Sequence, residues 1–263
     1  MKFTDQMQRE ITLEHSPQRI VSIVPSQTEL LADLGLEKEV IGITKFCIHP
    51  ENWFRTKERV GGTKTLSIEK IKSLKPDLIL GNKEENDKSQ VETLMATEKV
   101  WMSDIKTLGD ACEMIRRIGE LTKKKEKAEE FALEIEKRFS TFRKEISNFP
   151  KRRVAYFIWK NPYMVAGSET FIDHLLNICG LENIFAEMGR YPEVTMEELA
   201  KQNPEVVFLS SEPYPFREKH IKEMQAALPG AKIRLVDGEL FSWYGTKLLK
   251  SPGYFYELLS SLA

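Results

Sequence analysis

SIEKIKSLKPDLIL (Ser67–Leu80) and TMEELAKQNPEVVFL (Thr195–Leu209) follow one pattern, far apart in the chain. Each begins with a hydroxyl residue, has Glu third, Pro tenth and an acid eleventh, and ends in an apolar run. A hydroxyl start and a proline stop indicate a short helix, and the apolar run indicates a buried strand. Upstream, LLADLGLE (Leu30–Glu37) is echoed in the same order by LLNICGLE (Leu175–Glu182). We interpret the chain as two copies of one α/β unit. The alternative is chance, because helix, proline, acid and strand often follow one another in α/β proteins.

Apolar, β-branched runs alternate with helical segments along the whole chain. The expected strands are Arg19–Val24, Val40–Thr44, Asp77–Gly81, Lys99–Asp104, Arg153–Trp159, Val206–Ser211 and Ile233–Asp237. The expected helix caps are Ser26 with Glu29, Ser67, Ser168, and Thr195 with Glu198. Alternation of this kind favours parallel pairing through βαβ crossovers. The predicted fold class is therefore α/β, with two Rossmann-like lobes of parallel sheet and flanking helices.

One segment between the two copies breaks the alternation. LTKKKEKAEEFALEIEKRFSTFRKEISN (Leu121–Asn148) has no Gly or Pro, and its apolar residues recur every three or four positions. This spacing predicts one long amphipathic helix. We expect an N-terminal lobe over 1–122, a linking helix over 123–148 and a C-terminal lobe over 149–263, with a ligand cleft between the lobes. The alternative is a long surface helix of a single domain.

Composition excludes several classes of protein. The 263 residues carry 39 basic and 40 acidic side chains, a net charge of −1 that gives no footprint for nucleic acid. Three widely spaced cysteines make no disulfide framework. The N-terminus lacks the apolar region of a secretory signal, and no run reaches the roughly 18 apolar residues of a membrane span. We expect a monomer without membrane insertion, cytoplasmic as the sequence stands, and periplasmic or extracytoplasmic if a leader was removed.

Catalytic motifs are absent from the sequence. It contains no GxGxxG, GxxxxGK[ST], HExxH or GxSxG, and its four histidines lack metal-ligand spacing. This pattern argues against an enzyme and predicts no metal site. An alternative remains in KFCIHPENWF, where Cys47 and His49 could act as nucleophile and base on a small anionic metabolite, or bind a transition metal. The simpler interpretation is a buried structural cysteine.

Aromatic and polar residues gather just after the expected strands. The carboxyl edge of an open α/β sheet is where ligands bind, and rings with a few charges suit a flat or bulky ligand. The candidate ligand-binding residues on this basis are Lys45, Phe46, His49, Asn82, Trp159, Arg190, Tyr191, Asp237, Glu239, Trp243 and Tyr244. The rings would stack on the ligand, and the charged groups would orient it. The alternative is that these aromatics only hold the two lobes together.

Three stretches resemble the helical-backbone (class III) substrate-binding proteins of ABC importers for cobalamin, ferric siderophores and heme. They are RIVSIVPSQTELLADLGL, RVGGTKTLSIEKIKSLKPDLIL and YPEVTMEELAKQNPEVVFL. The resemblance implies two α/β lobes bridged by a long helix. It also implies a non-catalytic protein whose metal chelate is a transported ligand and not a prosthetic group. A member inside the cell would instead buffer or hand over such a complex.

The resemblance extends to individual residues. In the family, a glutamate on each lobe pairs with permease arginines, and the matching positions are Glu69 and Glu197. A carboxylate in the first turn of a helix also stabilises the helix without any partner. Cobalamin-binding members have aromatic side chains in the cleft at the positions of Phe46, Thr63, Asn82 and Tyr191. Phe46 and Tyr191 keep the aromatic character, whereas Thr63 and Asn82 depart from it. The resemblance adds Thr63 to the candidate ligand contacts. A third hypothesis is a protein partner bound through the two glutamates, with no function for the cleft.

Overall fold

Both copies of the repeated pattern fold as a short helix followed by a central strand. In the computed structural model, which describes residues 1–262, α3 (Ile68–Ser73) precedes β6 (Leu78–Asn82). The second copy gives α8 (Met196–Gln202) and β12 (Val206–Ser210). All residues of both strands are buried, as expected for strands covered on two faces. The predicted repeat is confirmed at this level.

The two copies also end their helices in the same way. Lys75 and Asn203 occupy the ninth position, and both have φ of 47° in the left-handed region. A left-handed residue followed by proline is a common way to stop a helix. Here Pro76 and Pro204 follow directly. The equal backbone angle shows that the sequence repeat is also a structural one.

The acid after the proline has a specific structural role in each copy. Asp77 Oδ1 accepts the backbone N–H of Arg19 at 2.9 Å, and Glu205 Oε2 accepts that of Arg153 at 2.9 Å. Arg19 and Arg153 stand at the start of the neighbouring central strands. A charge-assisted bond of this kind fixes the two strands in register. The acid is therefore part of the sheet and not only a surface charge.

The described chain forms two compact units. The first holds Met1–Ile105, Gly109–Glu136 and Tyr244–Lys247, and the rest of the described chain forms the second. The first unit thus contains four residues that come late in the sequence. The long helix changes from the first unit to the second after Glu136.

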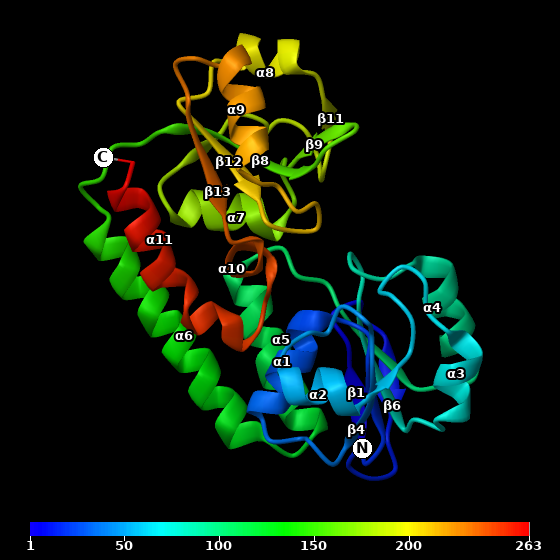
Figure 1. The fold of residues 1–263 in the computed structure, drawn as a ribbon. Helices are drawn as coiled ribbons and strands as arrows, with labels where there is room; N and C mark the ends of the chain where they lie inside the picture. Colours follow the sequence, from blue (N-terminus) through cyan, green and yellow to red (C-terminus); the bar gives the residue numbers. More distant parts are fainter. Residues whose placement is uncertain (263) are drawn as a thin grey trace. The chain divides into compact units, whose positions relative to one another are not determined.

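The first unit contains a five-stranded parallel sheet (Figure 1). Its order is β5 (Glu58–Arg59), β4 (Val40–Ile43), β3 (Ile20–Ser22), β6 and β7 (Val100–Ser103). Its helices are α1 (Pro25–Asp33), α2 (Glu51–Thr56), α3, α4 (Lys88–Met95) and α5 (Leu108–Leu121). The strand order reverses between β3 and β6, and ligands of such sheets bind outside the carboxyl ends at this point. An antiparallel hairpin of β1 (Lys2–Thr4) and β2 (Glu10–Thr12) was not expected from the sequence.

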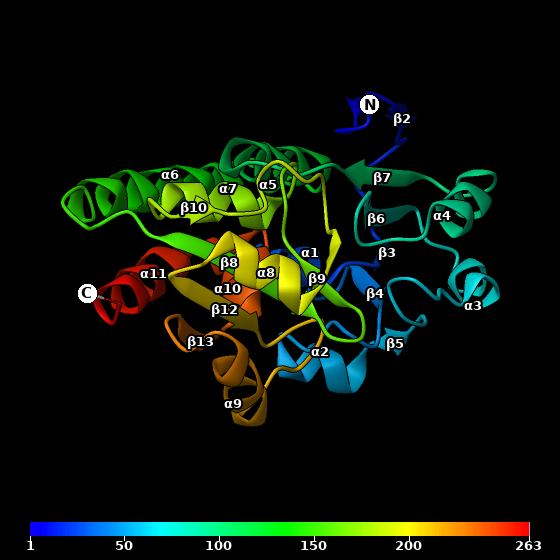
Figure 2. The same ribbon diagram turned by 90° about the horizontal axis from the view of Figure 1, so that it is seen from above.

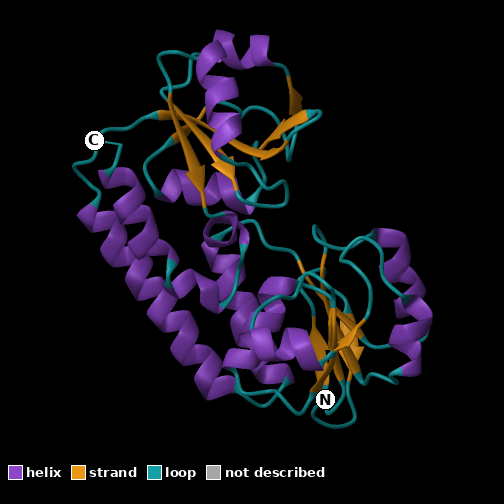
Figure 3. Cartoon of the chain, viewed as in Figure 1, coloured by secondary structure: helices purple, strands orange, loops and turns teal. Residues whose placement is uncertain are grey.

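The second unit has a six-stranded sheet with an antiparallel edge (Figure 3). The strands are β11 (Glu193–Val194), β9 (Tyr163–Val165), β8 (Arg153–Trp159), β12 and β13 (Lys232–Val236), with β10 (Glu182–Asn183) also beside β8. The other elements are α7 (Phe171–Ile178), α8, α9 (Glu218–Ala227), α10 (Gly238–Ser242), the 3₁₀ turn Thr246–Leu249 and α11 (Ser251–Ser260). β8, β10, β12 and β13 are parallel, whereas β9 and β11 are antiparallel. The parallel centre was predicted, and the antiparallel edge was not.

The long helix α6 (Lys125–Glu145) starts later than the sequence suggested. The chain turns at Lys123, with φ of 58°, so that α5 and α6 are separate helices. A Cβ on Gly119 would lie 2.3 Å from Ala128 Cβ, which shows how closely the two helices approach. In the second half of α6, the Phe139 ring centroid lies 6.5 Å from that of Phe255 in α11. The helices α6 and α11 therefore lie side by side (Figure 2). No helix within residues 1–262 is long and apolar enough to cross a membrane.

One predicted capping box forms and one predicted cap does not. Thr195 Oγ1 accepts the N–H of Glu198 at 3.1 Å, and Glu198 Oε2 accepts that of Thr195 at 2.7 Å. Ser67 occupies the cap position of α3, but its side chain makes no capping bond. The capping box predicted at Thr195 is confirmed, and the cap predicted at Ser67 is wrong.

Two further cap predictions are wrong in position. Ser26 was expected to cap with Glu29, but α1 begins at Pro25, whose fixed φ suits the first helical position. Ser168 was expected to cap α7, but Thr170 does so and accepts the N–H of Asp173 at 3.1 Å. In both places the helix begins at a different residue from the one expected, and the predicted serine is therefore not at the cap position.

We expect Gly167→Ala to destabilise the second unit. A Cβ at this position would lie 2.0 Å from the backbone oxygen of Met188, which no side-chain movement relieves. Such a clash typically costs about 1–3 kcal/mol. Urea denaturation measures the loss, with Gly253→Ala as control, because nothing lies within 4 Å of that Cβ on α11. Equal midpoints for the two variants would contradict the expectation.

Candidate functional site

An exposed ring stands at the carboxyl edge of the first sheet. Phe46, in the loop after β4, is 50% exposed, and Ile48 is 43% exposed. The Lys45 ammonium lies 5.1 Å from the Phe46 ring centroid. The ring rests on Gly62, where an added Cβ would lie 3.1 Å from Phe46 Cε2. Phe46 is therefore held against backbone while half of its surface stays exposed, and stacking of its ring on a ligand stays a prediction.

Asn86, which the sequence did not single out, ties the neighbouring loops together. Its Nδ2 donates to the backbone oxygens of Ile23 and Thr63, each at 3.1 Å. Its Oδ1 accepts the N–H of Asn82 at 2.8 Å. Because the amide is 4% exposed, these bonds have little competition from solvent. Asn86 thus fixes the chain after β3, β5 and β6 at the point where the strand order reverses.

Asn82 and Thr63 contribute to this framework in different ways. The Asn82 side chain is 1% exposed, donates to Ser103 Oγ at 2.9 Å and accepts the N–H groups of Glu84 and Glu85 at 2.8 and 3.0 Å. Its amide therefore shapes the loop after β6. Thr63 is half-buried and supplies its carbonyl to Asn86. Their contact with a ligand stays a prediction.

Cys47 lies in a setting that suppresses its chemistry. The thiol is fully buried, with Sγ 3.1 Å from Thr28 Oγ1 and 3.1 Å from Thr44 Oγ1. Burial raises the pKa of the Cys47 thiol, which disfavours the thiolate that acts as nucleophile or metal ligand. Within residues 1–262 no group of three or more His, Cys, Asp and Glu is arranged to hold a metal. Nothing in this geometry favours Cys47 and His49 as a catalytic pair.

We expect Cys47 to resist thiol-directed reagents in the native protein. Its burial and raised pKa keep the population of accessible thiolate low. Cys112 and Cys179 are also buried, so all three thiols should react with Ellman's reagent only after denaturation. A thiol that reacts rapidly near neutral pH, and that Cys47→Ser removes, would restore the enzyme alternative.

The second sheet also presents an exposed ring, at the end of a central strand. Trp159 ends β8 and is 39% exposed. It packs edge to face on Tyr214 at 5.7 Å, and Tyr214 packs on Phe216 at 4.8 Å. Tyr214 and Phe216 follow β12, so this support also belongs to the carboxyl edge. Trp159 therefore resembles Phe46 in position and exposure.

Arg190 and Tyr191 reach the second sheet in a way that the sequence did not suggest. The Gly167 N–H donates to the Arg190 oxygen at 2.7 Å, and the Arg190 N–H donates to Ser168 at 2.8 Å. Arg190 is exposed, with φ of 61°, and Tyr191 is half-buried. They belong to the chain that enters the antiparallel edge strand and not to a loop after a parallel strand. Their contact with a ligand stays a prediction.

Asp237 and Glu239 lie after β13, as predicted, at the start of α10. Asp237 caps the helix by accepting the Glu239 N–H at 3.0 Å. The backbone N–H of Asp237 donates to Tyr254 Oη at 2.8 Å. Asp237 is exposed and Glu239 half-buried, and the contact of either with a ligand stays a prediction.

Trp243 and Tyr244 do not present open rings. They are 7% and 5% exposed, respectively. Trp243 Nε1 donates to Glu212 Oε1 at 2.8 Å, and Ser242 Oγ donates to the same oxygen at 2.8 Å. Burial raises the pKa of Glu212, while these two bonds oppose the rise. The sequence drew attention to Trp243 but missed Glu212, the acid that holds it. Stacking by Trp243 and Tyr244 on a ligand stays a prediction.

A buried ion pair fixes Tyr244–Lys247 against α1 in the first unit. Lys247 Nζ lies 3.1 Å from Glu29 Oε1, with the side chains 8% and 16% exposed. Thr246 donates to Asp33 one turn further along α1. Burial raises the pKa of Glu29, and Lys247 is the strongest opposing influence. His49, in the loop that carries Phe46, also lowers the Glu29 pKa.

Glu69 and Glu197 occupy equivalent places in the repeat. Each is exposed in the first turn of its helix, α3 or α8. Neither forms an ion pair with another residue among 1–262. Their equivalence is consistent with the resemblance, and their function stays a prediction.

Comparison with known proteins identifies the family. The periplasmic binding protein family model matches residues 20–230. The vitamin B12-binding protein of Pectobacterium carotovorum subsp. carotovorum (strain PC1) is 26% identical over 253 residues, covering 94% of this chain and 90% of that protein.

Solved structures share the fold. A periplasmic heme-binding protein from Pseudomonas aeruginosa superposes with a TM-score of 0.81 at 22% identity, covering 94% of this chain and 92% of that one. A protein of an ABC-type Fe3+-hydroxamate transport system from Saccharomonospora viridis superposes with a TM-score of 0.74 at 19% sequence identity, covering 98% of each chain. The repeated α/β units and the family match lead to one conclusion: the chain belongs to the periplasmic binding protein family.

Proposed function

We propose that this protein binds a metal chelate, without catalysis, as the substrate-binding component of an ABC importer. The ligand is a corrinoid such as cobalamin, a heme or a ferric siderophore. The observation that carries the proposal is the pair of exposed rings, Phe46 in the loop after β4 and Trp159 at the last position of β8. The relatives are named for vitamin B12, heme and Fe3+-hydroxamate, and all three ligands are bulky chelates.

The side chains around these rings suit a ligand that brings its own metal. Open aromatic faces stack on macrocycles and supply most of the contact area in such sites. Lys45, beside Phe46, provides a positive charge for the polar substituents of the chelate. The thiol in this region is buried and hydrogen-bonded to threonines, so it is poorly suited to coordinate the ion. The metal would therefore enter and leave inside its chelator.

A titration tests the proposal. Purified protein is titrated with cobalamin, heme and several ferric siderophores while tryptophan fluorescence is followed, with inner-filter correction. We expect one class to give saturable quenching, because Trp159 lies at the proposed contact. If none of them gives a saturable response, and native mass spectrometry finds no chelate carried from the cell, the proposal fails.

We propose further that Glu69 and Glu197 dock the protein on the importer's permease, outside the cytoplasm. Two exposed carboxylates at equivalent positions suit two equivalent cationic sites on a partner. Reversal of both charges to lysine should abolish co-purification with the permease and leave chelate affinity unchanged. Glu218→Lys, at an exposed acid in the first turn of α9, is the control. Retained co-purification of the double variant would show that docking lies elsewhere.

A further inference from the structure

The Phe46 ring is supported by a short loop, residues 61–66, that follows β5. The Lys45 N–H donates to the Gly61 oxygen at 2.8 Å, so the two segments are joined through their backbones. A Cβ on Gly62 would lie 3.1 Å from Phe46 Cε2 and 3.3 Å from Lys45 Cε. The backbone of this loop is therefore the surface against which both side chains lie, and its position decides where the exposed ring stands.

Two amides from the chain after β6 hold this loop. Asn86 Nδ2 donates to the Thr63 oxygen at 3.1 Å, and Gln90 Nε2 donates to the Lys64 oxygen at 2.9 Å. Asn86 is 4% exposed, whereas Gln90 is half-buried, so water competes less for the Asn86 bond. Thr63 is also the direct neighbour of Gly62, which touches the ring. Of the two amides, Asn86 thus acts closer to Phe46 and in the drier place.

The same Asn86 side chain is fixed to the centre of the first sheet. Nδ2 also donates to the oxygen of Ile23, which directly follows β3, and Oδ1 accepts the N–H of Asn82 at the end of β6. All residues of these two strands are buried. A rigid sheet centre therefore sets the position of Asn86, and Asn86 passes that position to Thr63.

We propose that Asn86 is a positioning residue for chelate binding, which holds the 61–66 loop so that the Phe46 ring is ordered before the chelate arrives. Asn86 itself touches no chelate. A ring that is already fixed avoids the free-energy cost of ordering it on binding. The inference rests on the proposed function, because it takes Phe46 as a contact of the chelate.

The first test compares Asn86→Ala with the parent. Cobalamin, heme and a ferric hydroxamate siderophore are each titrated by calorimetry. For the chelate that binds the parent, we expect Kd to rise about two- to tenfold, because the loop must then be ordered on binding. If Asn86→Ala does not fold, Asn86→Asp replaces it, since a carboxylate keeps the shape and still accepts the Asn82 N–H.

A double-mutant cycle shows whether Asn86 acts through the ring. In the Phe46→Ala background, Asn86→Ala should change Kd little further, because there is no ring left to position. A purely structural role for Asn86 would give losses that add.

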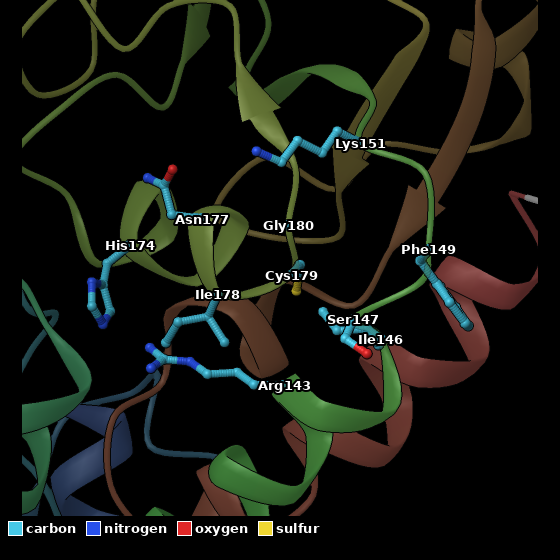
Figure 4. A pocket seen from close by; sticks show the side chains of 10 residues that line it. All are labelled: Arg143, Ile146, Ser147, Phe149, Lys151, His174, Asn177, Ile178, Cys179 and Gly180. Atoms are coloured by element: carbon cyan, nitrogen blue, oxygen red, sulfur yellow. The ribbon is translucent and has the colours of Figure 1, made fainter.

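Hydrogen exchange of the protein without chelate gives a readout that does not depend on the proposed function. Peptides covering residues 45–48 and 61–66 should exchange about fivefold faster, or more, in Asn86→Ala than in the parent. Peptides from the end of α7 are the internal reference. That helix end lines a cavity of about 360 Å³ in the second unit, and none of the described residues that line it is assigned to the chelate (Figure 4).

Asp5→Ala is the control for a general loss of stability in the first unit. Asp5 is fully buried, and its carboxylate accepts the N–H groups of Met7 and Arg9, each at 2.8 Å, and that of Met102 at 3.3 Å. These bonds fasten the β1–β2 hairpin to β7 and do not involve the 61–66 loop. Asp5→Ala should lower the urea midpoint and leave both Kd and the exchange of the loop unchanged.

The outcomes are distinguishable. Faster loop exchange with a raised Kd that disappears in the Phe46→Ala background supports the proposal. Unchanged loop exchange, an unchanged Kd, losses that add, or equal effects of Asp5→Ala would overturn it. Failure of the proposed function is seen separately, as the absence of saturable binding of all three chelates by the parent, and the inference then falls with it.

Discussion

Replacement of Lys247 by methionine should lower the free energy of unfolding by about 3–5 kcal/mol near neutral pH. The ammonium is the cation paired with Glu29, and both side chains are largely buried. Glu29 Oε2 is buried and has no hydrogen-bond partner within residues 1–262, so the carboxylate depends strongly on this pair. Methionine keeps most of the volume of the lysine stem, and the loss therefore reports on charge more than on packing.

The loss should depend on pH in a defined direction. Burial raises the pKa of Glu29 in the folded state above its unfolded value, and Lys247 opposes the rise. Without Lys247 the folded pKa rises further, and the carboxylate form becomes more costly. The deficit is therefore largest above the folded pKa of Glu29. It shrinks as the pH falls through that pKa, because a protonated carboxyl needs no cation.

Chemical denaturation over a series of pH values measures this effect. Lys250→Met, at an exposed lysine three residues after Lys247, is the control and should lose little stability. Adding Glu29→Gln to Lys247→Met should recover much of the stability, because the uncompensated charge is gone. A deficit that is independent of pH and is not reduced by Glu29→Gln would show that Lys247 acts through packing.

The largest functional effects are expected from Phe46→Ala and Trp159→Ala. Each should weaken binding of the chelate found by titration about tenfold or more, because a large aromatic contact typically contributes 1–3 kcal/mol or so. Both rings are open in the structure, so their removal should cost little stability. Binding is measured by calorimetry, because Trp159→Ala removes a fluorophore.

Tyr256→Ala is the matched control for these variants. Tyr256 is 42% exposed and packs on Phe149, outside the proposed contact. It should bind the chelate as tightly as the parent. If both ring variants also bind like the parent, the assignment of the rings is wrong, while the titration itself still decides whether the protein is a chelate carrier.

The main parallel strands, including the edge strands β7 and β13, could be predicted from the sequence, but the short strands β5, β9 and β11 could not. β8 runs from Arg153 to Trp159 as expected, because strands buried on both faces are continuous apolar runs. β11 consists of Glu193 and Val194 only, and it forms because Glu193 pairs with Met164 of β9, with α7 and β10 lying between them in the sequence. Such short strands depend on pairing between distant residues, and local sequence carries little trace of it.

The sequence could predict which candidate residues follow strands. It could not predict which of their side chains are exposed. Phe46 and Trp243 both follow strands in stretches rich in aromatics, yet one is 50% exposed and the other 7%. The difference arises because Glu212, 31 positions before Trp243, binds its indole N–H. Asn86 was missed for a similar reason, since its partners Ile23 and Thr63 come from two other loops. Burial of a polar hub depends on tertiary contacts that residue type does not encode.

The late return of Tyr244–Lys247 to the first unit has a consequence for biosynthesis. The ribosome makes α1, with Glu29, before any strand of the second sheet, and makes Lys247 only after β13. Domains usually fold in the order of their synthesis. Here the nascent first unit waits with an uncompensated carboxylate until the second sheet has been translated. A fragment that ends anywhere before Lys247 would leave the first unit in the same state, so the first unit is not expected to be stable as an excised domain.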